Sequence, residues 1–398
     1  MADDVLTTEE AEQFREKVRS FLAANTVPAA DFEQQKQFQA KLAEAGLAGI
    51  VFDREYGGAG LSKAHDRIVR EEMSKFPTMN NEFIISHGMC LPVLNDFGTE
   101  QQKKTFMPDN IAGRTLWCQM FSEPGAGSDV ASLQTKAERD GDEWIINGQK
   151  VWTTLAHKSQ YAVLIARTDP DAVKHAGISM FILPMDAPGV EVRPIHQIDG
   201  GSHFNEVFFT DVRIPADNLL GELNNGWNQA TAMLMYERVA IGTVGGGKIS
   251  QPNFKVLKAA AEAGGTMNDP NVRQDMMRIY SMETTKSLMA MRTRAEMKAG
   301  RAPGPGGSLG KLFGSVIQWR MREILMNMAG PASQAWVEGD AQAAELARMT
   351  VGSFSSSIAG GTDEIQRNII GDRVLGLPRD IAVDRSVAFK DLRVGTQR

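Results

Sequence analysis

Apolar side chains recur at helical intervals near the start of the chain. Thr7 and Glu10 have the spacing of a capping box and precede the first apolar stripe. The same period returns in residues 38–45 and 68–73. We therefore expect residues 1–116 to form an N-terminal helical domain.

The pattern changes after Leu116 to short apolar runs of strand length. The runs with the spacing of strands are residues 161–166, 178–183, 190–192 and 207–212. Asn147-Gly148 lies between two further short runs and favours a type I′ turn, which predicts a β-hairpin at this point. Several short strands in about 100 residues predict a sandwich or barrel, here a central β-barrel domain at residues 117–226.

The helical period returns after Gly226 and continues nearly to the end. Breaks are expected at Gly264-Gly265 and in the Pro/Gly-rich residues 302–307. Residues 227–398 are therefore predicted to be a bundle of three or four long helices. The order of helices, strands and helices indicates an α+β protein.

Composition narrows the function classes. The net charge of -6 gives no basic surface for a nucleic acid. No apolar run approaches the roughly 20 residues of a membrane span, and the acidic start resembles no leader peptide. Cys90 and Cys118 lie far apart, and the six histidines lack ligand spacing, so no metal is expected. We expect a cytoplasmic protein that binds neither nucleic acid nor membrane.

Two segments of the central domain are candidates for ligand binding. Residues 120–129 run from a strand into a glycine-rich turn with hydroxyls at Ser122 and Ser128. Such a turn can bind an anionic or carbonyl-rich ligand, but a surface loop without a ligand explains the segment equally well. Trp152 and Thr154 project from one face of a strand. A flat ring beside a hydroxyl suits a planar heteroaromatic cofactor, while a tryptophan packed in the core is the alternative.

Two helical segments complete the candidate set. Glu237 is the only ionisable residue on the apolar stripe formed by residues 227, 230, 234, 237, 241 and 244. Such a carboxylate is either a general base or the partner of Arg238. Thr362 follows Gly360-Gly361 as a helix N-cap, which can dock a cofactor or serve as a cap alone.

Together these motifs resemble the acyl-CoA dehydrogenase family over essentially the full length of the chain. The matching segments are residues 55–61, 97–102, 122–129, 147–152 and 361–367. The resemblance implies an N-terminal helical domain, a central β-barrel and a C-terminal four-helix bundle. It also implies FAD-dependent α,β-dehydrogenation of an acyl-CoA thioester.

The resemblance assigns roles to individual positions. The implied FAD contacts are Gln119, Met120, Phe121, Ser122, Gly127, Ser128, Trp152, Thr153, Thr154, Thr362 and Glu364. Thr154 donates near flavin N5, whereas Thr362 and Glu364 reach the adenosine side. The implied acyl-CoA contacts are Ser128, Arg238, Gly360 and Gly361.

Two departures from the family pattern are informative. Ala359 and Gly360 replace the Tyr-Glu pair that supplies the base in many members. In members resembling isovaleryl- and long-chain acyl-CoA dehydrogenases the base lies instead at the position of Glu237. Residues 253–258 depart from a segment that contacts a neighbouring subunit's flavin, and residues 328–331 are a reduced form of the family's glycine-rich FAD segment. This pattern also resembles bacterial α2β2 members, some of which act on steroid side-chain thioesters.

The implied reaction begins with polarisation of the thioester carbonyl by N–H groups near Gly360-Gly361 and by a flavin hydroxyl. Glu237 then takes the α-proton, and the β-hydrogen leaves as hydride to flavin N5. The expected partners are an electron-transfer flavoprotein and further subunits, as a homotetramer or an α2β2 heterotetramer. The alternatives are a non-catalytic or co-catalytic subunit and a flavin oxidase or monooxygenase on the same fold.

Overall fold

The computed structural model divides the chain into two compact units. It describes residues 6–77, 79, 81–243, 253–299, 306–334, 339–379 and 386–392. The first unit comprises Met1–Ile195, Ser202–Ala240 and Val383–Arg398, and the second comprises His196–Gly201 and Ile241–Ala382. None of the described helices combines the length and hydropathy that a bilayer span requires.

The first unit begins with helices, as predicted. They are α1 (Thr8–Asn25), α2 (Phe32–Glu44), α3 (Lys63–Met73), α4 (Leu91–Phe97) and α5 (Glu100–Ile111), with short helical turns at Arg54–Tyr56, Asn81–Phe83 and Ser86–Cys90. The capping box of α1 is confirmed: the Glu10 N–H donates to Thr7 Oγ1 at 3.2 Å, and the Thr7 N–H donates to Glu10 at 2.9 Å. Val18 and Leu22 of α1 pack into a core that also includes Val163 of the sheet and Met233 of a later helix. These helices therefore share one core with part of the sheet.

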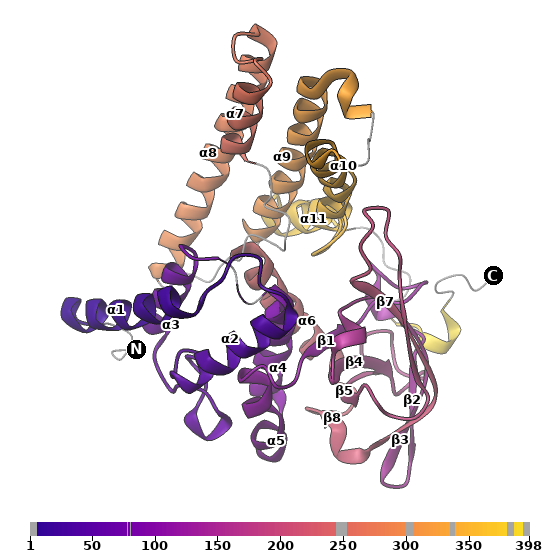
Figure 1. Ribbon diagram of the computed structural model, residues 1–398. Coiled ribbons are helices and arrows are strands. Elements are labelled where there is room, and N and C mark those ends of the chain that lie inside the picture. The colour runs from indigo at the N-terminus through magenta and orange to yellow at the C-terminus, as the bar shows by residue number, and fades with distance from the viewer. Residues whose placement is uncertain are drawn as a thin grey trace. The chain divides into compact units, whose positions relative to one another are not determined.

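Eight strands form one sheet (Figure 1). They are β1 (Trp117–Met120), β2 (Lys136–Asp140), β3 (Glu143–Thr154), β4 (Tyr161–Arg167), β5 (Ile178–Pro184), β6 (Val190–Pro194), β7 (Phe204–Pro215) and β8 (Leu219–Leu220). The order is β6-β7-β3-β2-β4-β5-β8, with β1 parallel to β4. The strands predicted from the sequence and the α+β class are confirmed. The sheet is open, because the outer strands β6 and β8 do not pair with each other in the described part of the chain.

The prediction of a β-hairpin turn at Asn147-Gly148 is wrong. These residues lie inside β3, where the register with β7 shifts between Ile146 and Gly148. Asn147 instead exchanges hydrogen bonds with Asp211, whose N–H donates to Asn147 Oδ1 at 2.9 Å. The positive φ of Gly148, 149°, serves this bulge. The turn between β2 and β3 is at Gly141 and the residue after it.

The remaining helices are α6 (Gly226–Thr243), α7 (Phe254–Ala263), α8 (Pro270–Lys298), α9 (Gly306–Ala329), α10 (Ala341–Gly352) and α11 (Asp363–Ile369). Helices α7 to α11 belong to the second unit, together with the end of α6 from Ile241 onwards. The rest of α6 belongs to the first unit. Leu257 of α7, Ile279 of α8 and Met321 of α9 form the core of that unit. The predicted helical character of this region is confirmed.

Candidate functional site

The glycine-rich segment after β1 forms a compact turn. Glu123 and Ala126 exchange main-chain hydrogen bonds of 2.9 and 3.0 Å. Gly127 and Ser128 are exposed beyond this turn, and Ser122 is half-buried. Gln119 is half-buried as well, whereas the side chains of Met120 and Phe121 are buried in the core, so only their main chains can reach a ligand.

A buried ion pair holds this turn against β3. Lys150 has no exposed side-chain surface, and its Nζ lies 2.8 Å from Glu123 Oε1 and 3.1 Å from the Phe121 carbonyl oxygen. The Gln134 N–H, at 2.6 Å, and the Thr135 N–H, at 3.0 Å, donate to the same carboxylate. Burial would raise the pKa of Glu123, but the charge of Lys150 and hydrogen bonds from Gln134, Lys150 and Thr135 lower it below its ordinary value. Burial lowers the pKa of Lys150, but the charge of Glu123 opposes this shift, so each partner stabilises the charged form of the other.

Two residues beyond Lys150, the strand presents an exposed aromatic ring. Trp152 adopts a left-handed backbone (φ 60°) at a bulge between β3 and β7, and 58% of its surface is exposed. It is therefore not packed in the core, which removes the alternative considered from the sequence. Thr154 is half-buried, while Thr153 is buried, with an Oγ1 that has no partner in the described residues.

The turn and the strand lie side by side. The N–H of Val151 donates to the carbonyl oxygen of Ser122 at 2.9 Å. Trp152, the next residue of the strand, therefore lies next to the turn that carries the hydroxyls. A bulky ring held exposed in an uncommon backbone conformation is a frequent sign of a ligand site. An exposed flat ring beside neutral hydroxyl and N–H donors fits a flavin, which offers a planar ring system with carbonyl groups.

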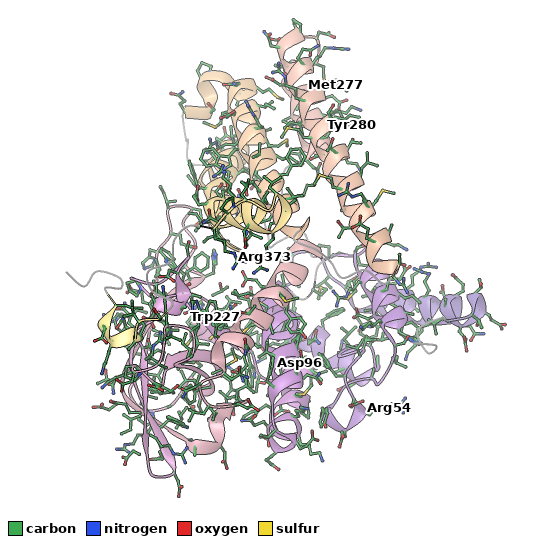
Figure 2. All side chains as sticks on the ribbon, turned by 180° about the vertical axis from the view of Figure 1, so that it is seen from behind. Arg54, Asp96, Trp227, Met277, Tyr280 and Arg373 are labelled. Atoms are coloured by element: carbon green, nitrogen blue, oxygen red, sulfur yellow. The ribbon has the colours of Figure 1, made fainter. Side chains whose placement is uncertain are left out.

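Glu237 lies on the buried side of α6. Ala230 of the predicted stripe has no exposed surface, nor has Met233, one turn before Glu237. Glu237, two turns after Ala230 on that stripe, is half-buried. Tyr236 donates to Asp96 of α4, and Figure 2 shows Asp96 on the helix beside the one that carries Trp227. Burial and Asp96 raise the pKa of Tyr236 to about 12, so its hydroxyl stays a donor. These contacts fix the turn of α6 that presents Glu237.

Some predicted positions of α6 lie outside what is described. The side chains of Arg238 and residue 241 are not described, and residue 244 lies outside the described ranges altogether. The proposed pairing of Glu237 with Arg238 therefore stays a prediction.

The second unit contains the remaining candidates. Thr362 caps α11 as predicted, accepting from the Ile365 N–H at 3.2 Å. Gly360 and Gly361 have φ values of 67° and 85°, and their carbonyl oxygens accept from the buried Gln366 amide at 3.1 and 3.3 Å. Glu364 is an exposed residue whose carboxylate pairs with Arg367 at 3.1 Å. The helix N-terminus and the glycine turn are thus one structural element.

Sequence reasoning missed three supporting residues. Lys150 and Glu123 hold the turn against β3, and Gln366 holds the glycine turn. A lysine directly before the apolar Val151 and Trp152 of a predicted strand was the available sign for Lys150. In the described residues no cluster of three or more His, Cys, Asp or Glu side chains could hold a metal ion.

Comparison with known proteins decides the family. Three family models match in order: acyl-CoA dehydrogenase N-terminal domain at residues 8–114, middle domain at 118–212 and C-terminal domain at 224–375. Acyl-CoA dehydrogenase IpdE1 of Mycobacterium tuberculosis is 38% identical over 389 residues, covering 94% of this chain and 99% of the relative. The chain belongs to the acyl-CoA dehydrogenase family. It is an oxidoreductase whose cofactor is FAD.

Solved structures agree with this assignment. The Tcur3481–Tcur3483 steroid ACAD has a TM-score of 0.78 at 27% identity, covering 94% of this acyl-CoA dehydrogenase and 99% of that chain. The ChsE4–ChsE5 complex from Mycobacterium tuberculosis has a TM-score of 0.74 at 30% identity, with the same coverage. The fold of this dehydrogenase is thus shared along nearly the whole chain.

Proposed function

We propose that this dehydrogenase converts an acyl-CoA thioester to its trans-2-enoyl derivative, with Glu237 as the base. The observation that carries the assignment of the base is the position of Glu237, which is half-buried two turns after the buried Ala230 on the apolar stripe of α6. At the position where many members have a glutamate this chain has Gly360. A positioned base contributes roughly 10²–10⁴-fold to the rate.

The residues around Trp152 are proposed to hold the cofactor. When bound, FAD supplies the acceptor for the hydride that leaves the β-carbon. The exposed Trp152 ring and Thr154 would contact its flat ring system, and Ser122, Gly127 and Ser128 would donate to its polar edge. Main-chain groups would contribute at Gln119, Met120, Phe121 and Thr153, and Thr362 and Glu364 would serve the adenosine end.

The chain's own groups then handle the substrate. Glu237 takes the α-proton on a carboxylate oxygen, and main-chain N–H groups at Gly360-Gly361 stabilise the negative charge on the thioester oxygen. Ser128 and Arg238 are proposed to bind the CoA portion.

A bulky acyl group, of the steroid type, is the proposed substrate. The proposal draws on Gly360, where an added Cβ atom would meet nothing within 4 Å and where no glutamate side chain takes up space. A similar structure bears the name of a steroid ACAD, and another is a complex of two different chains.

The proposal includes an electron-transfer flavoprotein as acceptor, a homotetrameric or α2β2 assembly, a cytoplasmic location, and domains at residues 1–116, 117–226 and 227–398.

Replacement of the base tests the proposal. Glu237→Gln keeps the size of the side chain but cannot take the proton, so we expect FAD to stay bound while turnover falls by roughly 10²–10⁴-fold. Anaerobic bleaching of the flavin by steroid and fatty acyl-CoA thioesters measures both binding and turnover. Glu222→Gln, at an exposed position before α6, is the matched control.

Near-normal turnover of Glu237→Gln would refute the assignment of the base. A purified chain that is folded but colourless would favour the non-catalytic or co-catalytic subunit. Rapid release of peroxide in air would favour the oxidase.

A further inference from the structure

Residues 386–392, here called the closing segment, pack against the loop between β4 and β5. Ala388 forms a β-bridge with Val173, and the Phe389 N–H donates to the Ala172 carbonyl oxygen at 2.9 Å. Lys390 adds an exposed ion pair of 2.6 Å to Asp171. In Figure 1 this segment, in yellow, lies beside the strands of the sheet. The closing segment is therefore held by both main-chain and side-chain contacts, which pair its residues Ala388–Lys390 with particular residues of the loop.

Phe389 covers a buried cation. Its ring is 5% exposed, and the Arg167 guanidinium carbon lies 3.6 Å from the ring centroid. Arg167 is itself 4% exposed and makes no ion pair with a carboxylate in the described part of the chain. Burial lowers its pKa to about 10, although Glu123 and Asp169 oppose this shift. The buried Nε of Arg167 has no hydrogen-bond partner in the described residues, and the aromatic face of Phe389 adds a favourable cation–π contact to this desolvated charge.

Arg167 in turn ties down the loop that follows Ser128. Its Nη2 donates to the Ala131 carbonyl oxygen and its Nη1 to the Lys174 carbonyl oxygen, both at 2.6 Å. The Lys174 Nζ lies 2.6 Å from Asp129 Oδ2. Asp129 is the neighbour of Ser128, so an unbroken series of contacts joins Phe389 to the exposed turn.

We propose that the closing segment positions the Ser128 turn for FAD and acyl-CoA, with Phe389 acting through Arg167. The inference rests on the proposed role of Ser128 in binding. Phe389 is a positioning residue, because the contacts described for it join it to Arg167 and the β4–β5 loop rather than to the exposed face of the turn.

Phe389→Leu in the full chain tests the role of the ring. Leucine fills much of the space but offers no aromatic face to Arg167. We expect hydrogen exchange to accelerate in residues 125–133, and the dissociation constant for FAD, measured by flavin fluorescence, to rise about tenfold, equivalent to about 1.4 kcal/mol. Phe389→Tyr, which keeps the ring, should lose much less FAD affinity than Phe389→Leu, and Lys390→Ala, which removes the exposed ion pair, should match the wild type.

Two results would overturn the proposal. One is a Phe389→Leu protein with wild-type exchange in residues 125–133 and wild-type FAD affinity. The other is faster exchange spread evenly over the whole sheet, because Phe389 would then be an ordinary core residue. Neither readout requires turnover, so a failure of Glu237 as the base would leave this test intact.

Discussion

Removal of the buried cation at Lys150 should destabilise the protein strongly. Lys150→Met leaves the Glu123 carboxylate, 6% exposed, with only the Gln134 and Thr135 N–H groups as described partners. Loss of one partner from a buried pair costs about 3–5 kcal/mol. Because two N–H groups still contact the carboxylate, we expect a loss near the lower end, about 3 kcal/mol. Urea unfolding at a fixed excess of FAD, followed by tryptophan fluorescence, measures this free energy.

Two comparisons separate the buried charge from a general effect of losing a lysine. Lys136→Met removes an ion pair with Glu138 in which the two side chains are 52% and 62% exposed. It should lower the free energy of unfolding by at most about 1 kcal/mol. The double variant Lys150→Met/Glu123→Gln removes the unpaired charge and should recover part of the loss. The reasoning is refuted if Lys150→Met is as stable as Lys136→Met, or if the double variant is no more stable than Lys150→Met alone.

Trp152→Ala should weaken FAD binding by about 0.5–1.5 kcal/mol with little change in melting temperature, because the ring is mostly exposed; a melting temperature lowered by many degrees would contradict this. Glu72 should make stability depend on pH in the acid range. Burial would raise its pKa, but hydrogen bonds from Lys75, Arg15 and Arg19 lower it to about 2. Its contribution is therefore complete above the ordinary value of 4.5 and is lost as the pH falls towards 2, so Glu72→Gln should lack this part of the acid unfolding curve; parallel curves would contradict it.

Features set by neighbouring residues were predictable from the sequence. The caps at Thr7 and Thr362 depend on residues three positions away, and both are present. The positions of the later strands followed from runs of apolar residues. The family followed from motifs whose order along the chain is specific.

Features that depend on distant pairing were not predictable. Asn147-Gly148 has the local preferences of a hairpin turn, but Asp211 of β7 supplies partners that make it a bulge instead. Closure of the sheet likewise depends on which outer strands meet. Within the site, the sequence identified Trp152 without deciding between exposure and burial. The ion pair of Lys150 and Glu123 joins segments that only the folded sheet brings together.

The contacts of the closing segment also have a consequence for synthesis. Arg167 is translated long before Phe389, yet the ring of Phe389 packs over its guanidinium group. Domains generally fold as units while the ribosome is still adding residues. Here the first unit lacks that contact until the nascent chain has grown past Phe389 and left the exit tunnel. The contact between Arg167 and Phe389 can therefore form only after residues Ile241–Ala382, nearly all of the second unit, have been synthesised.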